Sequence, residues 1–153
     1  MSEKLADIQY NFINLPSRIE FENGHVISYL YDADGIKLRT THIIGSDTTV
    51  TDYCGNVIYE NGIPVKLLTE AGYVTLADSK YHYFVQDHLG NNRVVVDQSG
   101  NVEEVNHYYP FGGLLSSSVS NAVQPYKYNG KELDRKNGLD WYDYGACMYD
   151  AAL

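Results

Sequence analysis

The stretch VISYLYDADGIKLRTT, residues 26–41, decides the fold. Val26–Tyr31 is rich in β-branched and aromatic residues, which favour strands. Asp34-Gly35 follows, and this pair tolerates the positive φ angles of a tight hairpin turn. Apolar and basic residues then alternate over Ile36–Arg39, as in a strand with one buried face. The stretch therefore predicts two antiparallel strands joined by a short turn.

The same turn signals recur along the chain. They lie at Asn23-Gly24, Asp34-Gly35, Gly45-Ser46, Gly55-Asn56, Asn61-Gly62, Ala71-Gly72, Gly90-Asn91 and Ser99-Gly100-Asn101. Most gaps between these glycines are about ten residues, the spacing of short strands joined by tight turns. Sustained helical periodicity is absent, and a single helical turn is expected over 132–136. We predict an all-β fold, an antiparallel hairpin meander that forms a curled sheet, a partial barrel or a shell segment.

Composition supports a sheet protein and excludes some partners. The chain has 15 Tyr against 4 Phe and 1 Trp, and Tyr fits a half-buried pleated surface. Its formal charge of −9 repels phosphate backbones, so no nucleic acid partner is expected. Residues 1–12 show no secretory signal, no apolar run reaches membrane-spanning length, and the compartment is left open. Cys54 and Cys147 are expected to stay reduced and to pack as small apolar side chains.

One short unit repeats imperfectly. It places an aromatic or branched pair, an acid and then a glycine, as in residues 29–35, with relatives at 51–56 and 84–91. An acid at the start of such a turn can accept hydrogen bonds from amides two residues ahead, while glycine takes the strained position. The unit therefore specifies a strand, a turn and a strand. Residues 114–124 are expected to form a loop, and residues 1–7 to fray.

Tyr-x-Tyr-Asp-x-x-Gly at residues 29–35 resembles the repeat of YD-repeat proteins, and the later part of the chain resembles the RHS repeat-associated core region. Four segments match in order, at Tyr83–Asn91, His107–Gly112, Tyr126–Glu132 and Gly138–Asp150. The sequences of these motifs are most similar to the versions found in Bacteroidetes. The structural motif residues that carry the resemblance are Tyr29, Tyr31, Asp32, Gly35, Asp87, His88, Gly90, Asn91, Tyr108, Tyr109, Pro110, Gly112, Gly130, Tyr142, Tyr144, Gly145, Tyr149 and Asp150.

The resemblance implies a division and a role. Residues 1–80 would supply YD-repeat hairpins and residues 81–153 the core segment, in one continuous sheet. In the family, the repeats form a β-ribbon that coils into a shell, usually exported, around a toxin or other cargo, which self-cleavage at an Asp-Pro motif releases. No Asp-Pro occurs here, so the sequence is expected to be truncated before that motif. Cys147 also stands where the family more often has Arg.

Candidate chemistry is weak by comparison. Asp32-Ala33-Asp34-Gly35 resembles the start of a calcium loop, but Ile43 stands where that loop needs a bidentate Glu. The five histidines show no HxH or HExxH spacing, and the serines at 116–118 lack a nucleophile-elbow context. We therefore expect no catalytic residue, no metal site and no cofactor.

These observations predict a non-catalytic segment of an RHS/YD-repeat shell of the kind that encapsulates toxin cargo. Its expected partners are the remainder of a larger shell, a cargo polypeptide, or further copies of itself joined through sheet edges. One alternative is a cell-surface module that binds carbohydrate or protein through its many aromatic rings. A hydrolase is a second alternative, which requires a concave site with perturbed carboxylates.

Overall fold

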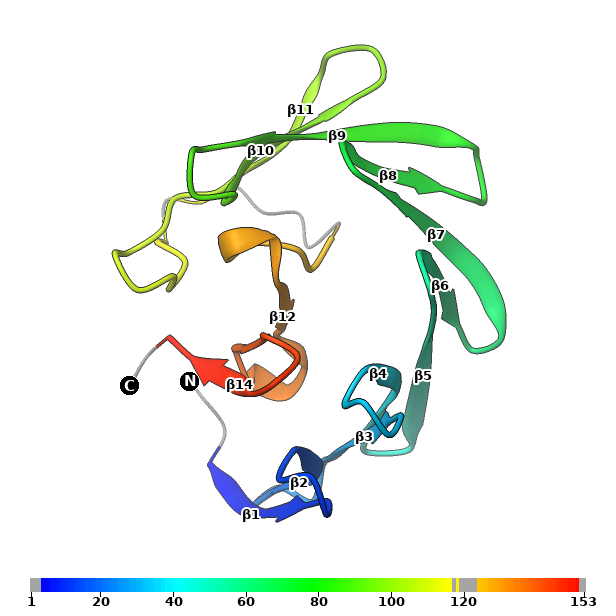
Figure 1. The fold of residues 1–153 in the computed structure, drawn as a ribbon, viewed down its shortest axis with the longest axis vertical. Coiled ribbons are helices and arrows are strands. Elements are labelled where there is room, and N and C mark those ends of the chain that lie inside the picture. The colour runs from blue at the N-terminus through cyan, green and yellow to red at the C-terminus, as the bar shows by residue number, and fades with distance from the viewer. Residues whose placement is uncertain (1–3, 117, 119–123, 152–153) are drawn as a thin grey trace.

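The computed structural model describes residues 4–116, 118 and 124–151. Its main element is one antiparallel sheet whose strands lie in sequence order, which confirms the predicted meander. The sheet curls into an open wall without closing into a barrel (Figure 1). Its strands are β1 (Leu5–Tyr10), β2 (Pro16–Phe21), β3 (Val26–Tyr31), β4 (Lys37–Ile44), β5 (Asp47–Cys54), β6 (Val57–Glu60), β7 (Ile63–Thr69), β8 (Gly72–Thr75), β9 (Lys80–Gln86), β10 (Asn92–Asp97) and β11 (Val102–Val105).

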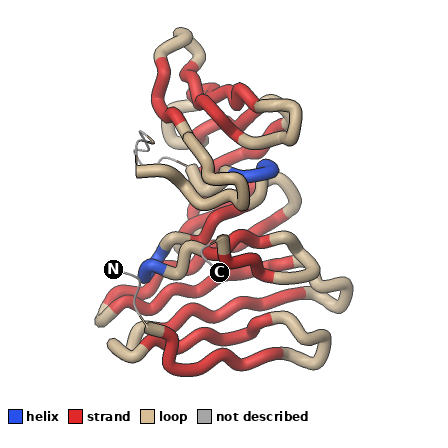
Figure 2. The backbone as a smooth tube through the Cα atoms, turned by 90° about the vertical axis from the view of Figure 1, so that its left-hand side faces the viewer, coloured by secondary structure: helices blue, strands red, loops and turns tan. Residues whose placement is uncertain are grey.

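A smaller sheet lies inside the curve of this wall (Figures 1 and 2). It has three antiparallel strands, and two 3-10 turns lie in the same part of the chain. Their order along the chain is η1 (Tyr128–Gly130), β12 (Glu132–Asp134), η2 (Lys136–Gly138), β13 (Trp141–Asp143) and β14 (Met148–Asp150). We call residues 124–151 the C-terminal segment. The helical turn expected over 132–136 is wrong, because Leu133 pairs with Tyr142 in a strand ladder.

One turn geometry accounts for the repeated unit. At Asp32, carboxylate Oδ1 accepts hydrogen bonds from the amides of Asp34 and Ile36, both at 2.9 Å. Gly35 takes φ 81°, a left-handed conformation that glycine adopts without a Cβ penalty. Asp87 and Asp97 accept the amides two and four residues ahead in the same way. A local hydrogen bond thus sets each of these hairpin connections.

Several expectations need correction. Asp52, in the proposed relative at 51–56, does not cap its turn but pairs across the strands with Arg39. Part of the stretch expected to fray, Leu5 onward, forms strand β1 because it pairs with β2; residues 1–3 lie outside the description. Cys54 and Cys147 are exposed, so neither packs in the core. The loop expected at 114–124 lies partly outside the described residues.

The wall has an inner and an outer face, and alternation along each strand decides which side chains lie on which. The inner face packs on the C-terminal segment, where Ile19, Phe21, Ile27 and Tyr29 form a core cluster with Leu139. The sheet continues through β9 across the boundary drawn between 1–80 and 81–153, a division that stays a prediction. In the part of the chain that is described, no helix is long and apolar enough to span a membrane.

Candidate functional site

We call the contact of the inner face of the sheet with the C-terminal segment and the loop before it the seam, and part of the motif residues lie in it. Its first part is a group of charges around β12. Lys37 Nζ lies 2.6 Å from Glu132 Oε2 and 2.6 Å from Asp143 Oδ2. The Tyr53 hydroxyl donates to Glu132 Oε1 at 2.7 Å. Two strands of the sheet thus hold two strands of the C-terminal segment.

Asp134 is the second anchor of β12. It lies 3.0 Å from His42 Nε2 and accepts a hydrogen bond from the Tyr29 hydroxyl at 3.1 Å. Burial alone would raise the pKa of Asp134, but the hydrogen bond and charge of His42, the Lys136 amide and Tyr29 lower it. Tyr29 in turn has a raised pKa, because it is buried and next to this carboxylate. The arrangement therefore favours an ionised, structural Asp134.

A buried ion pair fixes the start of the C-terminal segment. Glu104 on β11 is 0% exposed, and its Oε1 lies 2.5 Å from Nζ of Lys127, whose side chain is 2% exposed. Gln124 Nε2 and Asn106 Nδ2 donate to the same oxygen. Burial lowers the pKa of Lys127, and Glu104 opposes that shift. A carboxylate so enclosed is a specific attachment point.

The turn at Asp87 joins two of the motifs that the sequence singled out. Asn91 Oδ1 accepts the amide of Asn129 at 2.8 Å, and Asn129 Nδ2 donates to the Leu89 carbonyl at 3.0 Å. The Tyr144 hydroxyl completes the group by donating to Asn129 Oδ1 at 2.7 Å. Asp87 therefore shapes a turn that contacts Asn129, a residue about forty positions away in sequence.

Hydrogen bonds from tyrosine hydroxyls hold the loop at 110–112, which has no strand partner. Their hydroxyls donate to three successive carbonyls: Tyr128 to Pro110 at 3.0 Å, Tyr149 to Phe111 at 2.8 Å and Tyr142 to Gly112 at 2.8 Å. A Cβ on Gly112 would lie 2.7 Å from the ring of Tyr128, so only glycine fits there. Much of the tyrosine content of the C-terminal part thus satisfies backbone groups.

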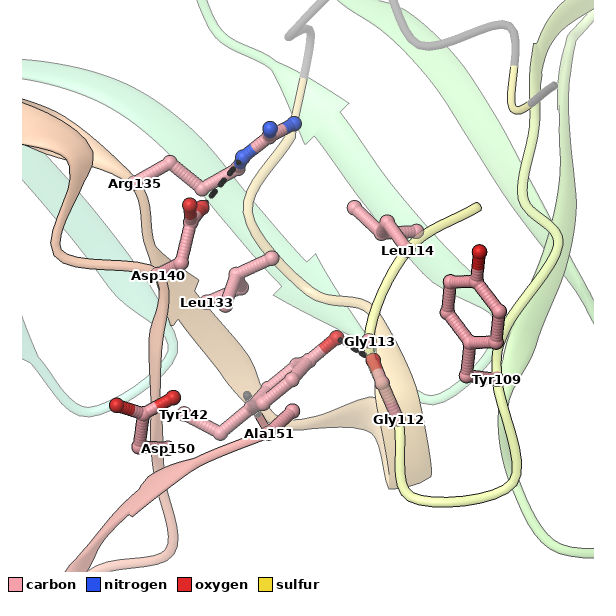
Figure 3. Close-up of a pocket in the computed structure, with 10 residues that line it drawn as sticks. All are labelled: Tyr109, Gly112, Gly113, Leu114, Leu133, Arg135, Asp140, Tyr142, Asp150 and Ala151. Atoms are coloured by element: carbon pink, nitrogen blue, oxygen red, sulfur yellow. Dashed lines mark hydrogen bonds and ion pairs between the residues drawn. The ribbon is translucent and has the colours of Figure 1, made fainter. Parts of the chain in front are cut away.

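Several hollows open along the seam, and two of them lie beside the contacts described above. One, of about 320 Å³, lies beside the Tyr142 hydroxyl where it meets Gly112, with Arg135 and Asp140 paired at its rim (Figure 3). The other, of about 440 Å³, lies between β5–β7 and the C-terminal segment and is lined in part by Lys66 and Lys127. Both have the volume of a small-molecule site, although neither contains an assembled nucleophile, base and orienting group among its described lining residues.

Four carboxyl groups in the described part of the chain have a lowered pKa: Asp78, Asp87, Asp97 and Asp134. Burial would raise the pKa of Asp87, but hydrogen bonds from Asn91 and Leu89 and the charge of Arg93 bring it to about 2. A general acid needs the opposite shift. In the described part of the chain no group of three or more His, Cys, Asp or Glu is arranged to hold a metal ion.

The predicted motif residues divide into three sets. Those in the seam are Tyr29, Asn91, Tyr108, Pro110, Gly112, Tyr142, Tyr144 and Tyr149. Those that shape turns are Asp32, Gly35, Asp87, Gly90, Tyr109, Gly130 and Gly145. The rest are Tyr31, which packs against the core cluster, His88, which is exposed, and Asp150, which accepts from the Trp141 indole at 3.2 Å.

Sequence reasoning missed the charged residues and the histidine that make contacts inside the wall. Lys37, His42, Glu104 and Lys127 carry the seam, yet none stands out by spacing. Glu104 follows Glu103 in a Val-Glu-Glu-Val run, and nothing in that run distinguishes the buried acid from its neighbour. Its burial depends on the C-terminal segment, more than twenty residues later in sequence.

Comparison with known proteins concerns the fold. No protein-family model and no curated protein matches the chain. Among solved structures, the Photorhabdus luminescens Tc holotoxin pore with a substituted TccC3 matches with a TM-score of 0.76 at 18% identity, over 95% of this chain and 8% of that one. A crystal structure of TcdB2-TccC3-TEV matches with a TM-score of 0.75 at 17% identity, over 95% of this chain and 8% of that one.

A crystal structure of TcdB2-TccC3 matches with a TM-score of 0.74 at 17% identity, over 98% of this chain and 9% of that one. The chain therefore spans less than a tenth of the length of these structures. The likeness supports the RHS-like fold that the motifs indicate. The Bacteroidetes character of the motifs and a truncation before the self-cleavage motif stay predictions.

Proposed function

We propose that this chain is a non-catalytic structural segment of an RHS/YD-repeat shell of the kind that encapsulates a cargo polypeptide. In this role residues 1–80 supply repeat hairpins, and residues 81–153 supply the core segment. The single observation that carries the proposal is the seam, where motif residues hold the chain's own C-terminal segment against the inner face of a curled meander. Likeness in fold to segments of the Tc toxin structures supports it.

The way the seam uses its polar groups favours architecture over ligand binding. The tyrosine hydroxyls that hold the loop at 110–112 donate hydrogen bonds to backbone carbonyls, and the Trp141 indole nitrogen donates to Asp150. These groups are therefore already engaged within the chain. A glycan site needs such groups turned toward solvent, where they can exchange hydrogen bonds with sugar hydroxyls.

Two matched turn variants test the proposal. Asp87→Ala removes a carboxylate whose turn receives Asn129, whereas Asp32→Ala removes the same turn hydrogen bonds at a site without that contact. We expect both to lower the melting temperature, and Asp87→Ala to lower it more, because it loosens the seam as well as the turn.

The rival, a carbohydrate-binding module, is tested on the unmodified chain with a glycan array and Trp141 fluorescence. A structural segment shows no saturable quenching and loses melting temperature in the Asp87→Ala variant. A specific saturable glycan, together with an unchanged melting temperature for that variant, would replace the proposal by the rival.

A further inference from the structure

Three buried side chains of the seam meet at one carboxylate oxygen. Lys127 Nζ and Asn106 Nδ2 each lie 2.5 Å from Glu104 Oε1, so no more than twice that distance separates the two nitrogens. Lys127, Glu104 and Asn106 are 2%, 0% and 1% exposed. An amine, a carboxylate and a carboxamide are thus held together at a site that excludes bulk water.

Two oxygens of this trio are unsatisfied. Among the described residues, neither Glu104 Oε2 nor Asn106 Oδ1 has a hydrogen-bond partner, although both atoms are buried. A buried acceptor without a donor costs free energy and calls for an explanation. The amide nitrogen of Asn106, by contrast, donates both to Glu104 and to the Asn92 carbonyl at 3.1 Å. The carboxamide is therefore fixed in orientation, while its carbonyl oxygen is available to accept a proton.

The amine of Lys127 lies in surroundings that favour a nucleophile. Burial lowers its pKa and the charge of Arg135 lowers it as well, whereas Glu104 raises it. A desolvated lysine gives up its proton more readily, and the neutral amine is the form that attacks a carbonyl carbon. Glu104 is placed to take that proton, because its Oε1 is in hydrogen-bond contact with Nζ.

We propose that Lys127 and Asn106 react to form an intramolecular isopeptide bond, with Glu104 as the proton carrier. The Lys127 proton passes to Glu104, and the neutral Nζ forms a bond to Cγ of Asn106. Oδ1 takes up the electron pair of the carbonyl and a proton from Glu104. Glu104 then moves a proton from Nζ to Nδ2, the bond between Cγ and Nδ2 breaks, and ammonia leaves. The carbonyl forms again and returns its proton to Glu104.

The reaction balances without any co-reactant. One amine and one carboxamide become one secondary amide and one ammonia, and Glu104 ends as a neutral carboxylic acid. A buried ion pair, which is costly to desolvate, is thereby replaced by neutral groups. Each chain reacts once, so the step matures the chain and turns over no substrate.

A second carboxamide touches the same oxygen, and its contacts disfavour it. Gln124 Nε2 donates to Glu104 Oε1 at 2.8 Å. Its carbonyl oxygen already accepts the Tyr126 amide at 2.6 Å. The oxygen of Asn106 has no such partner among the described residues, so we assign the bond to Asn106.

The bond joins the end of the sheet to the C-terminal segment. Asn106 directly follows β11, and Lys127 directly precedes η1. Closing the loop between them restricts the unfolded chain and so stabilises the fold. The inference does not rest on the shell role, because a chain without the bond keeps the hydrogen bonds of the seam.

Mass spectrometry of the purified full chain under denaturing conditions tests the bond. We expect an intact mass below the encoded mass by one ammonia. Chymotrypsin cuts after Tyr108 and Tyr126, yet the peptides that contain Asn106 and Lys127 should stay joined as one branched product. Trypsin should no longer cut after Lys127. Treatment with hydroxylamine should leave the branch intact, whereas it opens the succinimide that asparagine also forms by losing ammonia.

Variants of the trio should keep the full encoded mass. Lys127→Arg retains a positive charge beside Glu104 but has no nucleophilic amine, and Glu104→Gln removes the proton carrier. Lys66→Arg is the matched control. Lys66 lines the same hollow as Lys127 and burial lowers its pKa too, but its amine lies over the ring of Tyr73. This variant should lose ammonia as the unmodified chain does.

The full encoded mass in the unmodified chain, after prolonged incubation at neutral pH, would overturn the proposal. A mass deficit that persists in Lys127→Arg, or a branched peptide that joins Lys127 to Gln124, would overturn it as well. The peptide map of the unmodified chain decides the matter even where a variant does not fold.

Discussion

The eleven-stranded sheet and the C-terminal segment are stabilised by different kinds of contact. Each sheet strand pairs with the next one along the chain, so its backbone hydrogen bonds are local. The C-terminal segment is attached by side chains far away in sequence, as between Tyr29 and Asp134, 105 positions apart. This difference shows that the hairpin units specify the curled sheet, whereas a few buried polar groups specify where the C-terminal segment lies on its inner face.

The largest effect is expected at Glu104. Glu104→Gln keeps the shape but leaves the Lys127 ammonium buried without its charge partner, which costs about 3–5 kcal/mol of unfolding free energy. The control is Asp52→Asn, which breaks the more exposed pair with Arg39 on the sheet and should cost at most about 1 kcal/mol. Urea unfolding measures both, and equal losses would remove the distinction between the two regions.

The second largest loss of unfolding free energy is expected when a methyl group is added at Gly112. Gly112→Ala meets the Tyr128 ring at 2.7 Å and adopts φ 93°, so we expect a loss of about 2–5 kcal/mol. Gly100→Ala, in a sheet turn with φ 84° and nothing within 4 Å, should lose only about 1–2 kcal/mol. Thermal unfolding compares the two. A Gly100 variant as damaged as the Gly112 variant would mean that local turn strain, not the seam, sets the cost.

Acid should loosen the seam through Asp134. Its folded pKa lies below the ordinary value of 3.8, so its ionised form adds stability above pH 3.8 that is lost as pH falls through the folded pKa. The unfolding free energy should therefore drop as pH falls below about 4, and Asp134→Asn should make the drop shallower. Urea midpoints between about pH 2 and 6 measure the slope, and the same slope in both proteins would contradict this assignment.

The smallest effect separates two tyrosines of the loop contact. Tyr142→Phe leaves the Gly112 carbonyl without its buried donor and should cost about 1–2 kcal/mol. The hydrogen bond from Tyr149 to Phe111 is exposed, so water replaces it and Tyr149→Phe should cost at most about 0.5 kcal/mol. Differential scanning calorimetry resolves the order, and a reversed order would count against burial as the cause.

The sheet could be predicted from the sequence because the residues that determine each hairpin lie close together along the chain. The acid and glycine at 32 and 35 specify their own turn, and alternation over 36–39 indicates its strand. Sequence reasoning failed at 132–136, where a charged stretch forms a strand because Leu133 pairs with Tyr142. Glu104 was missed for a related reason: its burial depends on Lys127, and no periodicity in the sequence encodes that approach.

Amide hydrogen exchange of the unmodified chain and of Glu104→Gln tests most directly whether the seam, rather than the sheet, holds the C-terminal segment. We predict that in Glu104→Gln the amides of Glu132–Asp134 and Trp141–Asp143 lose more protection than the amides of Val26–Tyr31 and Lys37–Ile44, whose loss does not exceed the loss of unfolding free energy. Unchanged exchange in β12 and β13, or equal acceleration throughout the chain, would contradict it.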